Sequence, residues 1–123
     1  MIASYTRLYS DAAGQSHFEN LDIELSVNDF ASSAPPLYLS FLTNAARFGF
    51  FAAPAGWESD WHPSSARNFF VIISGEWEVT ASDGETRRFG SGNVLLCEDI
   101  SGRGHKSRVT GDQESVAVLI ELN

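Results

Sequence analysis

The sequence contains little cysteine and little positive charge. Cys97 is the only cysteine among the 123 residues, which excludes an internal disulfide and favours a reducing compartment. Eight Lys and Arg residues stand against sixteen Asp and Glu residues, so the formal net charge is -8. A chain with this charge balance has no electrostatic footprint for nucleic acid or for an anionic membrane.

Segments that target or anchor a protein are also lacking. The first sixteen residues, MIASYTRLYSDAAGQS, do not contain the basic head and apolar stretch of a signal peptide. No apolar run approaches the roughly 18 to 20 residues that a membrane-spanning helix needs. We therefore expect a soluble cytoplasmic protein, with neither nucleic acid nor a membrane as its partner.

Alternation of apolar and polar residues is the main pattern that the sequence does contain. In residues 21–27 (LDIELSV) and 115–122 (SVAVLIEL) every second residue is apolar, which is typical of half-buried antiparallel strands. Stretches rich in β-branched and aromatic residues, bounded by Gly, Pro, Asp and Ser, predict further strands. These stretches are residues 37–42, 46–52, 68–74, 76–82, 85–90, 93–98 and 105–110.

The connections between these strands favour an all-β fold. Asp83-Gly84 predicts a tight hairpin with a two-residue turn, in which both residues take a positive φ. Residues 11–21 leave room for one helical turn at most. Many short strands with turn residues between them predict a β-sandwich or a small closed barrel, in which closure removes exposed edges.

One run of residues carries a family resemblance. Between Gly56 and Gly75, His62, Ser64 and Asn68 fall without a gap on the spacing G-x5-H-x-H-x3/4-E-x6-G. This spacing resembles the first motif of the cupin superfamily, with Ser64 at a histidine position and Asn68 at the glutamate position. The strand, hairpin and next strand that follow, SGEWEV and DGETRRFGSGNVLL, are also similar to those of cupins.

The second cupin motif, G-x5-P-x-G-x2-H-x3-N, is matched by Gly102 and His105. Ile100 stands at its proline position and Val109 at its asparagine position, and Gly92 lies two residues too far upstream for the leading glycine. The segment EDISGRGHKSRV resembles the EDTTGKGH loop of a group of small single-domain bacterial cupins. The resemblance implies an all-β jelly-roll barrel, often a homodimer. Residues 48–123 would form the barrel core, and residues 1–47 would pack on it as N-terminal strands and loops within one domain.

Cupins with a metal present three histidines and one carboxylate, a set that suits Fe, Mn, Ni or Zn. The resemblance carries two of these histidines over to His62 and His105. Ser64 and Asn68, which stand at the other two positions, are neutral and are poor ligands for such metals. If the segment is extended, Asp60 lies on the same face as His62 and would supply a carboxylate for a set of two histidines and one carboxylate. The alternative is a site without any cofactor.

Without a metal, the two imidazoles can still move protons near neutral pH. The sequence therefore predicts a small-molecule pocket built on His62 and His105. The favoured function is an enzyme, metal-assisted or metal-free, that carries out acid–base chemistry such as isomerisation, dehydration or cyclisation. One alternative is a non-catalytic cupin that binds a metabolite. Another is a protein that only assembles, through apolar strand edges such as PPLYLSFL.

The remaining candidate site residues lie close to the two histidines in sequence. Arg67 would either fork onto a substrate carboxylate or form a surface ion pair. Glu98 and Asp99 would either orient a histidine or form a solvated acidic turn at the rim. The candidate substrate-binding residues are Ser64, Asn68, Arg67 and Trp57, the last at the mouth of the pocket.

Overall fold

The computed structural model describes residues 1–29 and 31–123. The described residues form strands and no helix. The strands are β1 (Ile2–Ser10), β2 (Ser16–Glu24), β3 (Ser26–Asn28), β4 (Leu37–Leu39), β5 (Arg47–Ala53), β6 (Asn68–Ser74), β7 (Glu76–Ala81), β8 (Thr86–Phe89), β9 (Val94–Glu98), β10 (His105–Thr110) and β11 (Ser115–Glu121). No helix of the described chain is long and apolar enough to cross a membrane.

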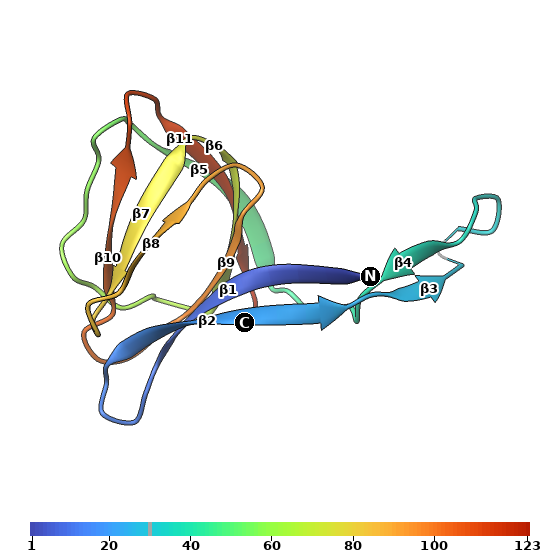
Figure 1. Ribbon diagram of the computed structural model, residues 1–123, viewed down its shortest axis with the longest axis horizontal. Helices are drawn as coiled ribbons and strands as arrows, with labels where there is room; N and C mark the ends of the chain where they lie inside the picture. The colour runs from blue at the N-terminus through green and yellow to red at the C-terminus, as the bar shows by residue number, and fades with distance from the viewer. Residues whose placement is uncertain (30) are drawn as a thin grey trace.

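Two sheets face each other and form an open-ended barrel (Figure 1). The larger sheet has six strands in the order β2-β1-β9-β6-β11-β5, and the smaller has three in the order β10-β7-β8. Alternation decides which side chains fill the space between them. In β7, for example, Trp77 and Val79 are buried between the sheets, whereas Glu78 and Thr80 are only partly buried. The all-β jelly-roll expectation is therefore confirmed.

The N-terminal strands are built into the larger sheet. β1 pairs antiparallel with β2 along its whole length and parallel with β9 over residues 6–9. The helical turn that residues 11–21 left room for is not formed. Instead, Asp11 begins a tight turn in which its carboxylate accepts hydrogen bonds from the backbone N–H of Ala13 at 2.9 Å and of Gln15 at 3.0 Å. This turn carries the chain from β1 into β2.

The predicted hairpin at Asp83-Gly84 is present, but its turn differs from the predicted type. β7 and β8 pair antiparallel from Trp77↔Phe89 to Thr80↔Thr86. Gly84 has a φ of +97°, and no residue other than glycine has a positive φ among the described residues. The backbone N–H of Ala81 donates to the carbonyl of Glu85 at 2.9 Å. The connection is thus a three-residue loop closed by a glycine, and only one of its positions requires positive φ.

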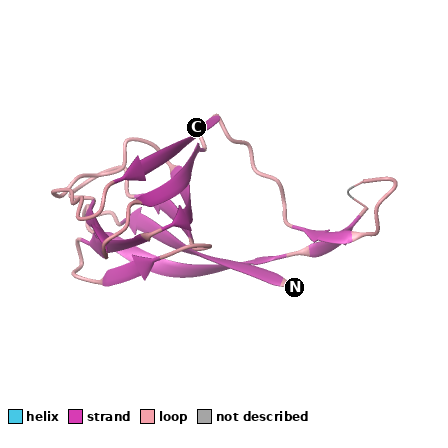
Figure 2. Ribbon diagram, turned by 90° about the horizontal axis from the view of Figure 1, so that it is seen from above, coloured by secondary structure: helices cyan, strands magenta, loops and turns pink. Residues whose placement is uncertain are grey.

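A two-stranded arm projects from the barrel (Figures 1 and 2). It consists of β3 and β4, which pair antiparallel with Val27 opposite Tyr38. The segment 40–46 then leads back to β5, which is an edge strand of the larger sheet. The arm therefore lies apart from the core, while every strand that surrounds the site described below belongs to the barrel.

Candidate functional site

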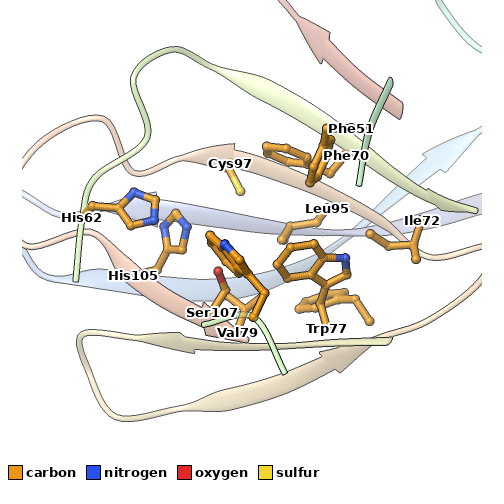
Figure 3. Close-up of a pocket in the computed structure, with 12 residues that line it drawn as sticks. Phe51, His62, Phe70, Ile72, Trp77, Val79, Leu95, Cys97, His105 and Ser107 are labelled. Carbon is orange, nitrogen blue, oxygen red and sulfur yellow. The ribbon is translucent and has the colours of Figure 1, made fainter. Parts of the chain in front are cut away.

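His62 and His105 lie side by side at one end of the barrel interior (Figure 3). His62 belongs to the connection between β5 and β6, and His105 is the first residue of β10. Their backbones form an isolated antiparallel bridge, with N–H···O distances of 2.9 Å and 3.0 Å. Their ring centroids are 4.7 Å apart, at an interplanar angle of 57°. The structure thus brings together the two histidines that the sequence singled out.

The partners of the two imidazoles determine where their protons lie. Nδ1 of His105 is 2.5 Å from Oδ2 of Asp99, and Nδ1 of His62 is 3.1 Å from the carbonyl oxygen of Pro63. Because carboxylate and carbonyl oxygens only accept hydrogen bonds, we assign the proton to Nδ1 in both rings. In the neutral state each Nε2 then carries a lone pair, and no protein group is bonded to either Nε2 in the described structure.

Asp99 fixes the orientation of His105 from inside the protein. Its side chain is 0% exposed, and His105 itself is only 8% exposed. The hydroxyl of Ser64 donates to Oδ1 of Asp99 at 2.8 Å, while its backbone N–H donates to the Asp99 carbonyl oxygen at 2.9 Å. A buried carboxylate needs such partners because it has lost its hydration. Of the two alternatives left open for Asp99, the structure therefore shows the orienting residue and not a solvated turn.

The glycine-rich loop before His105 packs directly against neighbouring backbone. Gly104 has a φ of +74°, and a Cβ there would overlap the carbonyl group of His62. Gly102 has a φ of +73° and approaches Gly14 in the β1–β2 turn just as closely. The hydroxyl of Ser16 donates to the carbonyl oxygen of Gly104 at 2.7 Å. The N-terminal hairpin therefore braces the loop that positions His105, a role that the sequence did not suggest for Gly14 or Ser16.

A cavity of about 190 Å³ extends from the two histidines into the barrel. Its polar lining comes from His62, His105 and Ser107, together with the thiol of Cys97. The rest of the lining is apolar, and much of it is aromatic: Phe51, Trp57, Phe70, Trp77 and Phe89. Trp57 and Trp77 meet edge to face at 5.6 Å, as do Phe51 and Phe70 at 5.4 Å. The cavity is thus an aromatic chamber with imidazoles at one end.

Cys97 is a buried thiol in the cavity wall. Burial raises its pKa well above the ordinary range, and the negative charge of Asp99 raises it further. The hydrogen bond with Ser64 acts in the opposite direction but is the smallest of the three effects. Because the thiolate is the reactive form, Cys97 fits the role of a buried structural residue and not that of a nucleophile.

Two other candidate substrate-binding residues, Arg67 and Asn68, are not among the residues that line the cavity. Nε of Arg67 donates to Glu98 at 2.5 Å, and Nε of Arg7 donates to the other oxygen of Glu98 at 2.6 Å. Burial alone would raise the pKa of Glu98, but the hydrogen bonds and charges of the two guanidinium groups outweigh it, so its pKa is lowered. Asn68 is buried, and its Nδ2 donates to the carbonyl oxygen of Ala66 at 3.0 Å, while its Oδ1 has no partner among the described residues.

Asp60 lies apart from the histidine cavity. Its carboxylate accepts a hydrogen bond from the backbone N–H of Trp61 at 2.8 Å. It lines a separate depression of about 580 Å³, beside Glu58, Lys106 and Arg108. The chain bends at Trp61, and only isolated bridges flank the bend. The alternation that would put Asp60 on the face of His62 is therefore interrupted.

The side chains at the histidines do not match the expected metal-binding set. Two neutral Nε2 atoms are available, but Asp99 is engaged with Nδ1 of His105, and the raised pKa of Cys97 keeps its thiol protonated. Within residues 1–29 and 31–123, no group of three or more His, Cys, Asp or Glu side chains is arranged to hold a metal ion. Fe, Mn, Ni and Zn sites in proteins usually use at least three such ligands.

The chain was also compared with known proteins. No protein-family model matches it, and no curated protein sequence matches it. Among solved structures, it is similar to the DMSP lyase DddQ from Ruegeria pomeroyi, with 18% identity and a TM-score of 0.52, covering 81% of this chain and 47% of that one. A predicted oxalate decarboxylase from Thermotoga maritima has 18% identity and a TM-score of 0.50, covering 82% and 94%.

A cupin domain from Bordetella pertussis has 17% identity and a TM-score of 0.48, covering 82% of this chain and 93% of that one. At identities this low, likeness concerns the fold, which hosts many different functions. The chain is a small all-β protein with the cupin jelly-roll fold.

Proposed function

We propose that the protein carries out acid–base chemistry on a small molecule held in the barrel cavity, with Nε2 of His105 as the base. The observation that carries this proposal is the buried pair of Asp99 and His105, which leaves an Nε2 lone pair beside an apolar chamber. A carboxylate at Nδ1 suits a histidine that accepts a proton on Nε2, because it holds the required tautomer and compensates the positive charge that forms on the ring.

The geometry supports a simple sequence of proton movements. Nε2 of His105 takes a proton from a substrate O–H, or from a C–H next to a carbonyl group. The electron pair of the broken bond stays on the substrate as an enolate or alkoxide. The positive charge that forms on His105 is compensated by Asp99, 2.5 Å away. The proton then returns to a different substrate atom, which completes an isomerisation, or to a leaving hydroxyl, which completes a dehydration.

His62 differs from His105 in its exposure and therefore in its proposed part. His62 is exposed to solvent, whereas His105 is buried. With its ring centroid 4.7 Å from that of His105, it can take up the second proton transfer and exchange its proton with water. Because Asp99 and His105 are both buried, the electrostatic interaction between the imidazolium and the carboxylate is stronger than it would be in water.

A second candidate function is binding without reaction. The same cavity supports it, because a binding pocket needs mainly shape, an apolar lining and a few placed polar groups. Under this reading the histidines would only accept hydrogen bonds from a metabolite. The buried carboxylate behind His105 is the feature that favours the enzyme.

Deuterium exchange distinguishes these functions without a known substrate. The protein is incubated in D2O with small neutral hydroxyketones, which carry both an O–H donor and a C–H next to a carbonyl group, and incorporation of deuterium at that carbon is followed by mass spectrometry. We expect exchange that falls by about 100-fold or more in His105→Gln, the usual scale of a general base. His17→Gln, which changes the one histidine outside the cavity, should retain the wild-type rate. Equal rates in wild type and His105→Gln would contradict the proposal, and tight binding without exchange would favour the binding function.

A further inference from the structure

The lining of the histidine cavity contains no ionic side chain. Neither Lys, Arg, Asp nor Glu contributes to the wall, which is formed by apolar groups, two imidazoles, a serine and a thiol. Lys106, next to His105 in sequence, lies over the ring of Trp61 at 5.3 Å, and Arg67 is bonded to Glu98. Arg103 lies over the ring of Trp61 at 4.2 Å, and Arg108 is bonded to Glu78 at 3.0 Å. With both imidazoles neutral, an anionic ligand would therefore lose its hydration in this chamber without gaining a charged partner.

The two imidazoles define what the polar end of a ligand must offer. Both Nδ1 atoms are bonded to oxygen acceptors, so both Nε2 atoms are acceptors in the neutral state. Two adjacent acceptors repel a carbonyl or carboxylate oxygen and attract an O–H or N–H group. A ligand should thus present a hydrogen-bond donor at this end of the chamber.

The size and shape of the chamber define the rest of the ligand. Apolar protein cavities of about 150 Å³ bind benzene, and this cavity measures about 190 Å³. Its aromatic walls already hold edge-to-face contacts with each other, and a flat ring would extend that packing. There is room for one six-membered ring with a small substituent.

From these three observations we propose that the cavity takes a neutral, flat, mainly apolar molecule with one hydroxyl, enol or N–H donor, such as a phenol or an enolised cyclic ketone. While both imidazoles are neutral, small dianions and other anions are disfavoured as ligands. This inference rests on the same site as the proposed function and adds the class of molecule on which that site acts. The donor hydrogen that the two Nε2 atoms recognise is also the hydrogen that His105 would remove.

Three probes that share one ring test this inference by isothermal titration calorimetry near pH 7. Phenol is neutral and has a donor, anisole is neutral and has none, and benzoate is an anion. We expect phenol to bind at least about 10-fold more tightly than anisole and about 100-fold more tightly than benzoate, because a lost hydrogen bond or an unpaired charge is costly in an apolar site. Benzoate binding as tightly as phenol would overturn the inference.

Variants of the two histidines test whether these residues cause the preference for a ligand with a hydrogen-bond donor. In His62→Ala and in His105→Gln, the preference for phenol over anisole should shrink to a few-fold, whereas Arg67→Gln should keep the wild-type preference. An unchanged preference in both histidine variants would also overturn the inference. The outcome is independent of turnover: phenol selectivity without deuterium exchange would leave the inference standing while the proposed reaction fails. Deuterium exchange into an anionic 2-oxo acid, without phenol selectivity, would do the reverse.

A second inference comes from the arm, far from the cavity. The arm and the segment after it expose several large apolar side chains: Val27, Leu37, Tyr38, Phe41 and Leu42. Phe41 is 97% exposed. On the barrel, the edge strand β5 exposes Phe48 at 73% and Phe50 at 69%. Exposed apolar patches of this kind, and unpaired edge strands, mark surfaces that a partner covers.

Charge and area favour a second copy of this chain as that partner. Residues 26–46 contain one charged residue, Asp29, in a chain whose net charge is -8. Two copies with this net charge repel each other, and contact surfaces that carry little charge add least to that repulsion. At roughly 150–250 Å² for each aromatic side chain, Phe41, Phe48 and Phe50 together expose on the order of 500 Å². A standard interface buries about 800 Å² on each partner, so the aromatic groups provide most of one.

We propose that the arm of each protomer covers the β5 face of the other, in a two-fold symmetric homodimer. Such an arrangement is self-complementary, because each copy offers both the arm and the edge strand. It gives a specific form to the homodimer that the sequence resemblance implies.

Sedimentation velocity at micromolar concentration tests the dimer. We expect wild type to sediment as a dimer and the double variant Phe41→Asp, Leu42→Asp to sediment as a monomer with an unchanged circular dichroism spectrum. Ile100→Asp, which changes an exposed apolar residue outside the arm and β5, serves as the matched control and should remain dimeric. A monomeric wild type would overturn the proposed dimer, and a dimeric double variant would overturn the role of the arm.

Discussion

The carboxylate of Asp99 and the imidazole of His105 are joined by a hydrogen bond of 2.5 Å inside the barrel. Nε2 lies on the far side of the ring from Asp99, and His105 lines the cavity that Trp57, Trp77 and Phe70 help to form. A buried carboxylate that holds one tautomer of a histidine, next to an empty apolar space, is the arrangement of a base and its orienting group. We expect this arrangement to affect the unfolding free energy of the protein, its metal content and the position of the proton on His105.

The two histidines should contribute unequally to stability. His105→Ala leaves Asp99 buried without its main partner, and loss of one member of a buried pair typically costs about 3 to 5 kcal/mol. His62→Ala removes an exposed ring whose side-chain bond to Pro63 is long, at 3.1 Å, and should cost less than about 1 kcal/mol. Urea unfolding of both variants measures the difference. Equal losses of unfolding free energy would show that Asp99 does not depend on His105.

Gly104 should tolerate no side chain. Gly104→Ala combines a positive φ with overlap of the His62 carbonyl, so we expect a loss of roughly 3 kcal/mol. Gly92→Ala is the matched control, because Gly92 also has a positive φ, +86°, but a Cβ there meets nothing within 4 Å. It should cost only about 1 to 2 kcal/mol. Equal costs in thermal or urea unfolding would mean that the loop can move away from His62.

Stability should depend on pH through His17. Its imidazole lies between Asp11, at 2.7 Å, and Asp83, at 2.9 Å. The hydrogen bond with Asp11 is the main cause that raises the pKa of His17, and the same bond lowers the pKa of Asp11. Because the folded-state pKa of His17 is raised, its contribution is complete below the ordinary value of 6.5 and disappears as the pH rises through the raised pKa.

The contribution of Asp11 has the opposite dependence. Its pKa is lowered, so its contribution is complete above the ordinary value of 3.8 and is lost as the pH falls through the lowered pKa. The melting temperature of wild type should therefore exceed that of His17→Gln by the largest amount between about pH 4 and pH 6.5. The gap should narrow towards about pH 9. A gap that widens with rising pH would contradict the ion pairing of His17.

Metal removal should leave the proposed reaction unaffected. The cavity offers two neutral imidazole nitrogens as metal ligands, and the described residues add no carboxylate or thiolate as a third ligand. Divalent metals should therefore bind weakly. Protein purified without a histidine tag should carry well under one metal ion per chain by plasma mass spectrometry. Dialysis against EDTA should change the deuterium exchange rate by less than about two-fold. A stoichiometric metal that is lost in both His62→Ala and His105→Gln would contradict this prediction.

Strand alternation and motif spacing together predicted the all-β fold and the meeting of His62 with His105. They did not predict β1, because IASYTRLYS mixes polar and apolar residues on both faces. With β1 unrecognised, nothing in the sequence linked the turn at Gly14 to the loop at Gly102. The contact between them depends on sheet pairing across more than eighty residues, and local patterns carry no information on such pairing.

The sequence was less informative about the ligands around the histidines. Asp60 was placed with His62 on the assumption of an extended strand, but the bend at Trp61 interrupts that strand. The alternation along 97–99 does explain the roles of the two acids. Cys97 and Asp99 are buried, whereas Glu98 lies on the other face and bonds Arg7 and Arg67. If the predicted strand 93–98 had been extended by one residue, the same alternation would have placed Asp99, the partner of His105, on the buried face.

The position of the proton on neutral His105 tests most directly whether its Nε2 can act as the base. Long-range 1H–15N correlation spectra of protein labelled with 15N-histidine distinguish an imidazole protonated at Nδ1 from one protonated at Nε2. At a pH where His105 is neutral, we expect a proton on Nδ1 and a lone pair on Nε2 in wild type. In Asp99→Asn the preference for the Nδ1-protonated tautomer should be weaker. A proton on Nε2 of His105 in wild type would contradict the account, since the ring would then present a donor, and no base, to the cavity.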